Sequence, residues 1–104
     1  MAADKAKSSD RTKKVTYQVR FTPAADRQLR NLDRQFQTQV FRRIEKLADD
    51  PRPPGVEKLE GEETIYRVRT GNYRILYTIN DKALVVLVIR VGDRKEVYRQ
   101  LPRL

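Results

Sequence analysis

Residues 64–79 read TIYRVRTGNYRILYTI, and this stretch decides the fold of the chain. On both sides of Gly71-Asn72, apolar and polar residues alternate with the two-residue period of a half-buried β-strand. A Gly-Asn pair between two such runs is typical of the tight turn that closes a hairpin. The sequence therefore predicts two antiparallel strands, Thr64–Thr70 and Tyr73–Ile79.

The turn also predicts which residues stand opposite each other across this hairpin. Arg69 is expected to pair with Arg74, and Arg67 with Leu76. Because side chains alternate between the faces of a sheet, the three arginines share one face. The opposite face is expected to carry apolar and aromatic side chains: Tyr66, Val68, Ile75, Tyr77 and Ile79.

Upstream of the hairpin, the sequence predicts a strand followed by a helix. Apolar residues alternate with polar ones from Val15 to Phe21, as in a half-buried strand. Thr22 and Pro23 then form a helix start, because proline lacks the N–H group that would be unpaired in the first turn. Apolar residues recur at steps of three and four over residues 25–47, which places them on one helical face.

Two interruptions shape this helical region. The polar segment Asn31–Gln35 predicts a break into two helices that pack as a hairpin. The Pro-rich segment Pro51–Gly55 ends the second helix. Downstream of residues 64–79, a third strand is expected over Leu84–Val91, with a short extension through Tyr98.

These elements define an α+β fold: an N-terminal strand, a two-helix hairpin and then an antiparallel three-stranded meander, with the helices packed on one face of the sheet. Residues 1–14 are polar and lack apolar periodicity, so we expect a disordered basic arm there. The 104-residue length otherwise suits one domain, over residues 15–104.

Composition excludes several kinds of chemistry. The chain has no cysteine, histidine or tryptophan, so thiol nucleophiles, thiolate metal sites and imidazole catalysis are all ruled out. We expect no cofactor and no metal. The longest apolar run, Ala83–Ile89, is far shorter than the roughly 20 residues of a membrane span. With no apolar segment near its start that resembles a secretory signal, the protein is expected to be cytoplasmic and without a membrane partner.

The charge distribution points to a polyanionic partner. The formal net charge is +9, and residues 64–104 contribute nine basic and only three acidic side chains. Two arginines directly opposite each other destabilise a sheet unless an anion lies between them, and guanidinium groups match phosphate oxygens. The alternative is that these arginines extend into water or pair with Glu62 or Glu63. Arg90 is a secondary candidate, whose face depends on a two- or three-residue loop at Asn80–Lys82.

The ordered set of motifs resembles a known family. YQVRFTPAADRQLRNL (17–32), DDPRPPG (49–55), KLEG (58–61), YRVRTGNYRILYTI (66–79) and VGDRKEVYR (91–99) together look like the RelE/ParE toxin superfamily, on the RelE side. The resemblance implies a type II toxin that enters the ribosomal A site and cuts mRNA by attack of the RNA 2′-hydroxyl on the adjacent phosphorus. It also implies three partners: a cognate antitoxin protein, the ribosome and mRNA.

The resemblance further implies which residues are catalytic. Matched position by position, they are Arg67, Arg69, Arg74, Arg94 and Tyr98. Many relatives have histidine where this chain has Asp93, so an imidazole role is absent here. Arginine, with a pKa above about 12, is a poor proton acceptor, which leaves the general base unassigned.

Two other functions are compatible with the same residues. ParE-like relatives share the fold and inhibit DNA gyrase without catalysis. A plain RNA- or ribosome-binding module would bind in a strongly salt-dependent way and leave RNA length unchanged.

Overall fold

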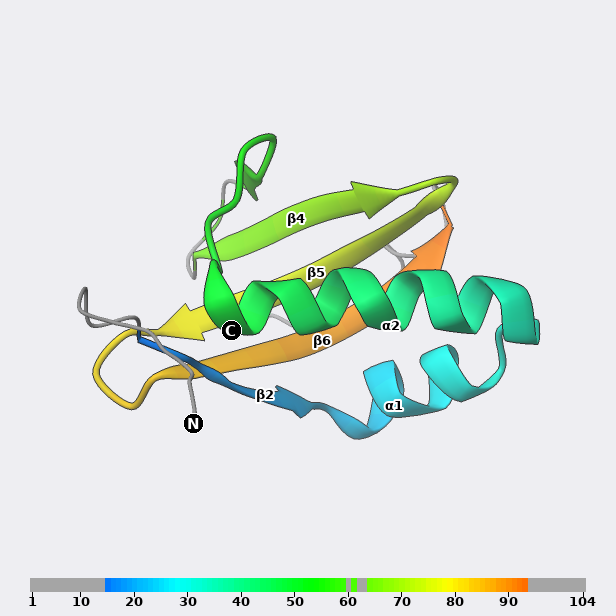
Figure 1. Cartoon of the computed structure of the whole chain (residues 1–104), viewed down its shortest axis with the longest axis horizontal. Coiled ribbons are helices and arrows are strands. Elements are labelled where there is room, and N and C mark those ends of the chain that lie inside the picture. Colours follow the sequence, from blue (N-terminus) through cyan, green and yellow to red (C-terminus); the bar gives the residue numbers. More distant parts are fainter. Residues whose placement is uncertain (1–14, 60, 62–63, 94–104) are drawn as a thin grey trace, which may run out of the picture.

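A β-sheet forms the centre of the protein in a computed structural model, which describes residues 15–59, 61 and 64–93 (Figure 1). Within these residues the sheet has five strands in the order β2-β6-β5-β4-β3. Helices α1 and α2 cover one of its faces, which confirms the predicted α+β class. The bounds are β2 Gln18–Phe21, α1 Pro23–Arg30, α2 Arg34–Asp49, β3 Glu57–Leu59, β4 Ile65–Thr70, β5 Tyr73–Asn80 and β6 Val85–Asp93.

The topology adds two features to the predicted meander. Strands β4, β5 and β6 pair antiparallel, as expected, whereas β2 lies parallel to β6 at one edge. The short strand β3 pairs antiparallel with β4 at the other edge, and it was not predicted. Its three residues, Glu57–Leu59, follow a Pro-rich loop and are too few to show an alternating pattern.

The predicted helix start at Thr22 is confirmed. Its Oγ1 accepts a hydrogen bond from the Ala25 backbone N–H at 3.1 Å, and Pro23 takes the first helical position. The same hydroxyl donates to the carbonyl of Ile89 at 3.1 Å, which ties the start of α1 to β6. The predicted break between the helices is also present, because α1 ends at Arg30 and α2 begins at Arg34.

The main core lies between the helices and the sheet. The side chains predicted for this face of the hairpin are all part of it, so the predicted inward direction is confirmed. The buried members are Ala25, Leu29, Val40, Ile44, Leu47, Val68, Ile75, Tyr77, Val86, Val88 and Val91.

A polar network closes the sheet at the end near the β5–β6 loop. Arg52 donates two hydrogen bonds to the carboxylate of Asp81, at 2.9 and 3.2 Å. The Tyr17 hydroxyl donates to the same carboxylate at 2.6 Å. The Arg52 guanidinium also lies over the ring of Tyr66. The network therefore links the segment before β2, the loop after α2, strand β4 and the β5–β6 loop.

Some predicted features lie outside the described residues: the basic arm at residues 1–14 and the extension through Tyr98. Within the described ranges, no helix has the length and apolar character needed to cross a membrane.

Candidate active site

The β4–β5 hairpin carries the three predicted arginines on the face away from the helices. Arg69 pairs with Arg74 and Arg67 with Leu76, which confirms the predicted register. Val68 and Ile75, their neighbours along the strands, are buried in the core beneath the helices, so the arginines point the other way. We call the outer surface formed by Arg67, Arg69, Arg74 and Arg90 the basic face.

Strand β3 brings a carboxylate onto this face. Glu57 pairs with Arg67, whose Nε donates to Glu57 Oε1 at 2.8 Å and whose Nη2 contacts the same oxygen. Arg69 Nη2 lies 3.7 Å from that oxygen. The hydrogen bond from Arg67, together with the nearby charges of Arg69 and Arg74, lowers the pKa of Glu57 below its ordinary value, so this side chain is ionised at neutral pH.

The sequence did not predict Glu57 on the basic face, because the carboxylates expected to pair with the arginines were Glu62 or Glu63. Both of those residues lie outside the described part of the chain. The alternative that the arginines pair with a carboxylate of the same chain is therefore partly correct, but the carboxylate is that of Glu57. Counting only the residues that the structure describes, Glu57 balances one of the two arginines that it contacts, so this pair of arginines and one glutamate has a net positive charge.

Arg74 differs from its neighbours in its bonding. Within the described residues its side chain has no hydrogen bond or ion pair, and its Nε is buried without a hydrogen-bond partner. A guanidinium N–H deprived of both water and a partner is costly, and an anionic ligand relieves that cost. The Arg74 side chain is therefore able to bind an anionic ligand.

A β-bulge brings Arg90 onto the same face. Leu76 pairs with Arg90 but the next residue, Tyr77, pairs with Val88, so Ile89 is the extra residue. Neither of the two loop lengths considered for Asn80–Lys82 is correct, because Asn80 pairs with Val85 and four residues form the loop. The irregularity in β6 decides the direction of Arg90.

An apolar cluster underlies the basic face, and the sequence pattern did not predict it. Ile65, Leu76 and Ile89 form a second buried cluster on the side of the sheet away from the helices, with Leu59 and Leu87 packed against it. Leu76 is fully buried although it stands opposite Arg67. Arg67 stands opposite Leu76 and its side chain is 17% exposed, so its charge is less screened by water than that of Arg69, which is 58% exposed.

The remaining two predicted catalytic residues, Arg94 and Tyr98, lie outside the described residues and stay predictions. Strand β6 ends at Asp93, which pairs with Tyr73 beside the Gly71-Asn72 turn. Among the described residues, no group of three or more carboxylate side chains is arranged to hold a metal ion.

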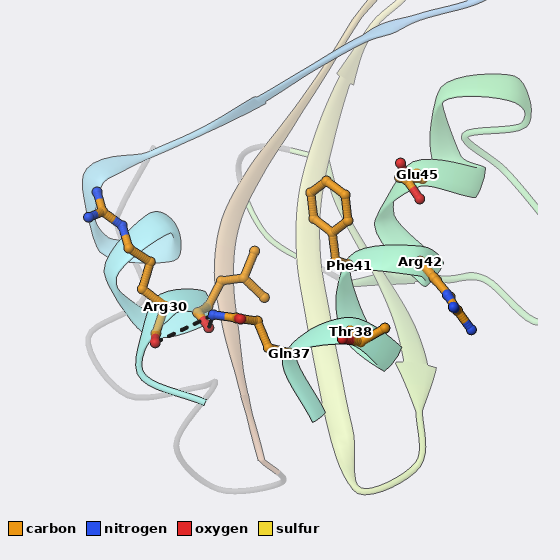
Figure 2. A pocket seen from close by; sticks show the side chains of 7 residues that line it. Arg30, Gln37, Thr38, Phe41, Arg42 and Glu45 are labelled. Carbon is orange, nitrogen blue, oxygen red and sulfur yellow. Dashed lines mark hydrogen bonds between the residues drawn. The ribbon is translucent and has the colours of Figure 1, made fainter. Parts of the chain in front are cut away.

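A second surface feature lies on the helical side of the protein. A groove of about 380 Å³ runs between α1 and α2, where Phe41 is 43% exposed (Figure 2). Gln37 borders it and donates a hydrogen bond to the Leu29 carbonyl at 3.1 Å. The full lining consists of Leu29, Arg30, Gln37, Thr38, Phe41, Arg42 and Glu45. An exposed aromatic ring beside two arginines suits a partner with apolar and acidic side chains.

Comparisons with known proteins agree with this architecture. Residues 19–98 match the family model described as the ParE toxin of type II toxin-antitoxin system, parDE. Toxin RelG of Mycobacterium tuberculosis is 32% identical over 87 residues, which cover 83% of this chain and 100% of the relative. The mRNA interferase toxin RelE of Escherichia coli K12 is 30% identical over 90 residues, covering 83% of this chain and 94% of the relative.

The fold is shared with solved structures. In the crystal structure of the toxin-antitoxin complex RelBE2 from Mycobacterium tuberculosis, one chain matches with a TM-score of 0.69 and 33% identity, over 77% of this chain and 100% of that chain. Fold and sequence together define a small toxin of the type II class. The chain belongs to the RelE/ParE toxin superfamily and is a RelE-like member of it, as the resemblance predicted.

Proposed function

We propose that this toxin is an endoribonuclease that cuts mRNA in the A site of the ribosome and so inhibits translation. The observation that carries the proposal is the cross-strand pair Arg69–Arg74, in which Arg74 Nε is buried without a partner. Such a pair is suited to a phosphodiester. The E. coli relative named an mRNA interferase supports the same activity.

The chemistry is attack of an RNA 2′-hydroxyl on the adjacent phosphorus with departure of the 5′-oxygen. Arg69 and Arg74 hold the phosphate and neutralise the charge that grows on its oxygens in the transition state. One well-placed donor of this kind contributes about 3–4 kcal/mol to transition-state stabilisation. Arg67, Arg94 and Tyr98 complete the proposed catalytic set, with Tyr98 orienting the 2′-hydroxyl.

Alignment of the reacting atoms lowers much of the remaining barrier in this proposal. The in-line geometry of hydroxyl, phosphorus and leaving oxygen is rare in flexible RNA, and the ribosome supplies it by holding the mRNA. Purified toxin should therefore cut mRNA in programmed ribosomes and cut the same free RNA far more slowly. Equal rates on the two substrates would refute ribosome dependence. Ribosome binding with RNA of unchanged length would indicate a binding module instead.

The second candidate function is inhibition of DNA gyrase without catalysis. It is favoured by the family model that matches, because that model describes the ParE toxin. A supercoiling assay run beside the mRNA cleavage assay separates the two functions. Loss of supercoiling with intact mRNA would replace the ribonuclease proposal.

We also propose a cognate antitoxin as the partner that keeps the toxin inactive. The M. tuberculosis structural neighbour was solved as a toxin-antitoxin complex. In this proposal, apolar side chains of the antitoxin occupy the groove around Phe41, and an acidic segment opposes the basic face. Co-expression with the protein encoded by the adjacent gene, followed by co-purification, tests for this partner.

A further inference from the structure

The proposed reaction needs an acceptor for the 2′-hydroxyl proton, and the basic face offers few candidates. Histidine and cysteine are absent from the chain, and arginine stays protonated at any physiological pH. Among the described residues, Glu57 is the carboxylate that the arginines of the basic face contact. A carboxylate is one of the side chains that act as general bases when they are held within reach of the proton.

The contacts of Glu57 leave one oxygen available. The hydrogen bonds from Arg67 and the closer approach of Arg69 all go to Oε1. Oε2 has no hydrogen-bond partner among the residues that the structure describes, and the Glu57 side chain is 46% exposed. Arg67 therefore orients the carboxylate through one oxygen while the second remains able to accept a proton.

Arg69 connects this carboxylate to the phosphate position. It lies 3.7 Å from Glu57 Oε1 and stands directly opposite Arg74 in the next strand. A phosphate held by Arg69 and Arg74 thus shares a guanidinium neighbour with Glu57. The 2′-hydroxyl of the same nucleotide is adjacent to that phosphate and would therefore lie on the same face of the sheet as Glu57.

We infer that Glu57 is the general base of the RNA cleavage reaction, an inference that depends on the proposed ribonuclease function. The O2′–P bond forms and the P–O5′ bond breaks, while the 2′ proton passes to Glu57 Oε2. The departing 5′-oxygen takes a proton from water. The neighbouring arginines keep Glu57 ionised and so ready to accept, but they also weaken it as a base. We therefore expect a contribution near the lower end of the usual 10²–10⁴-fold range.

The main competing role for Glu57 is to occupy the arginines until RNA displaces it. The two roles predict opposite effects of Glu57→Gln, which keeps the shape of the side chain and removes its charge. Loss of a base slows cleavage at unchanged or tighter ribosome binding. If Glu57 instead competes with RNA for the arginines, its loss should increase the cleavage rate, above all at low substrate concentration.

The test is single-turnover cleavage of mRNA in programmed ribosomes by the wild type, Glu57→Gln, Glu57→Ala and a control, Asp49→Asn. The control removes an equal charge from an exposed position at the end of α2. We expect Glu57→Gln to cleave about 100-fold more slowly while it pellets with ribosomes as well as the wild type, and Asp49→Asn to be unaffected. Added formate, a small carboxylate, should restore part of the activity of Glu57→Ala.

Each other outcome overturns the inference. Glu57→Gln that cleaves within about threefold of the wild type, or faster, excludes a general base at this position. A slow Glu57→Gln combined with a folded Glu57→Ala that formate does not rescue assigns Glu57 a structural role. If the wild type itself leaves ribosome-bound mRNA intact, the proposed function fails and this inference fails with it, which distinguishes that case from the first two.

Discussion

Arg69 and Arg74 stand directly opposite each other across the β4–β5 hairpin, so two positive charges occupy one cross-strand position. Like charges in this arrangement destabilise an antiparallel pair. Of these two arginines, Arg69 lies 3.7 Å from Glu57, whereas Arg74 has no ion pair among the described residues. The pair is therefore better explained by anion binding than by its contribution to folding.

Replacement of Arg74 should separate activity from stability. We expect Arg74→Gln to slow mRNA cleavage on ribosomes by about 100-fold or more, because one transition-state donor is lost. The free energy of unfolding should stay the same or rise by about 0.2–1 kcal/mol, because the cross-strand repulsion is removed. Urea unfolding and the cleavage assay measure the two effects. Arg27→Gln, at an exposed position of α1, is the control and should change neither; a destabilised Arg74→Gln would contradict this account.

The turn that aligns these arginines should be sensitive at Gly71. Its φ is +61°, and a Cβ atom there would lie 2.7 Å from Gln39 Nε2. Gly55 is a matched control, because its φ is also positive, at +87°, with nothing within 4 Å of a new Cβ. Both alanine variants should lose about 1 kcal/mol of unfolding free energy from backbone strain, and Gly71→Ala should lose more. Equal losses would show that the Gln39 side chain simply moves aside.

The Arg52–Asp81–Tyr17 network should make stability depend on pH. The hydrogen bonds from Arg52 and then Tyr17 hold the pKa of Asp81 below its ordinary value of 3.8. For a carboxyl group with a lowered pKa, the stabilisation is fully present above the unfolded pKa, about pH 4, and is lost as pH falls through the folded pKa. The Tm of Asp81→Asn should therefore lie below that of the wild type at pH 7.

The difference between these two Tm values should shrink as the pH approaches 3. Thermal unfolding followed by circular dichroism across this range provides the measurement. Asp49→Asn removes the same charge without touching the network, so its Tm should follow the wild type at every pH. A gap between wild type and Asp81→Asn that stays constant with pH would show that the stabilisation does not come from the ionised carboxylate of Asp81.

The groove between α1 and α2 should affect antitoxin binding and leave catalysis unchanged. Phe41 is 43% exposed in this groove, so Phe41→Asp removes an aromatic anchor without opening the main core. Loss of such an anchor typically costs 2 kcal/mol or more, about 30-fold in affinity. Calorimetric titration with purified antitoxin measures this loss. Unchanged affinity, or a parallel loss of ribosomal mRNA cleavage, would contradict the proposed division between the two surfaces.

Local patterns in the sequence were sufficient to predict the central hairpin. Alternation in residues 64–79 and the Gly71-Asn72 turn determine both the register and the face of Arg67, Arg69 and Arg74. Thr22-Pro23 likewise determined the start of α1. In each case, the decisive interactions join residues close in the chain, so residue type and spacing carry the information.

Only the tertiary structure decided the positions of Glu57 and Arg90. Glu57 reaches the basic face because β3 pairs with β4. No pattern in the connection between these two strands predicts that pairing. Arg90 turns to the same face because β6 contains a bulge at Ile89, and one extra residue reverses the direction of every side chain beyond it. Both positions depend on pairing between whole strands, whose energy comes from packing and hydrogen bonds that no short segment contains.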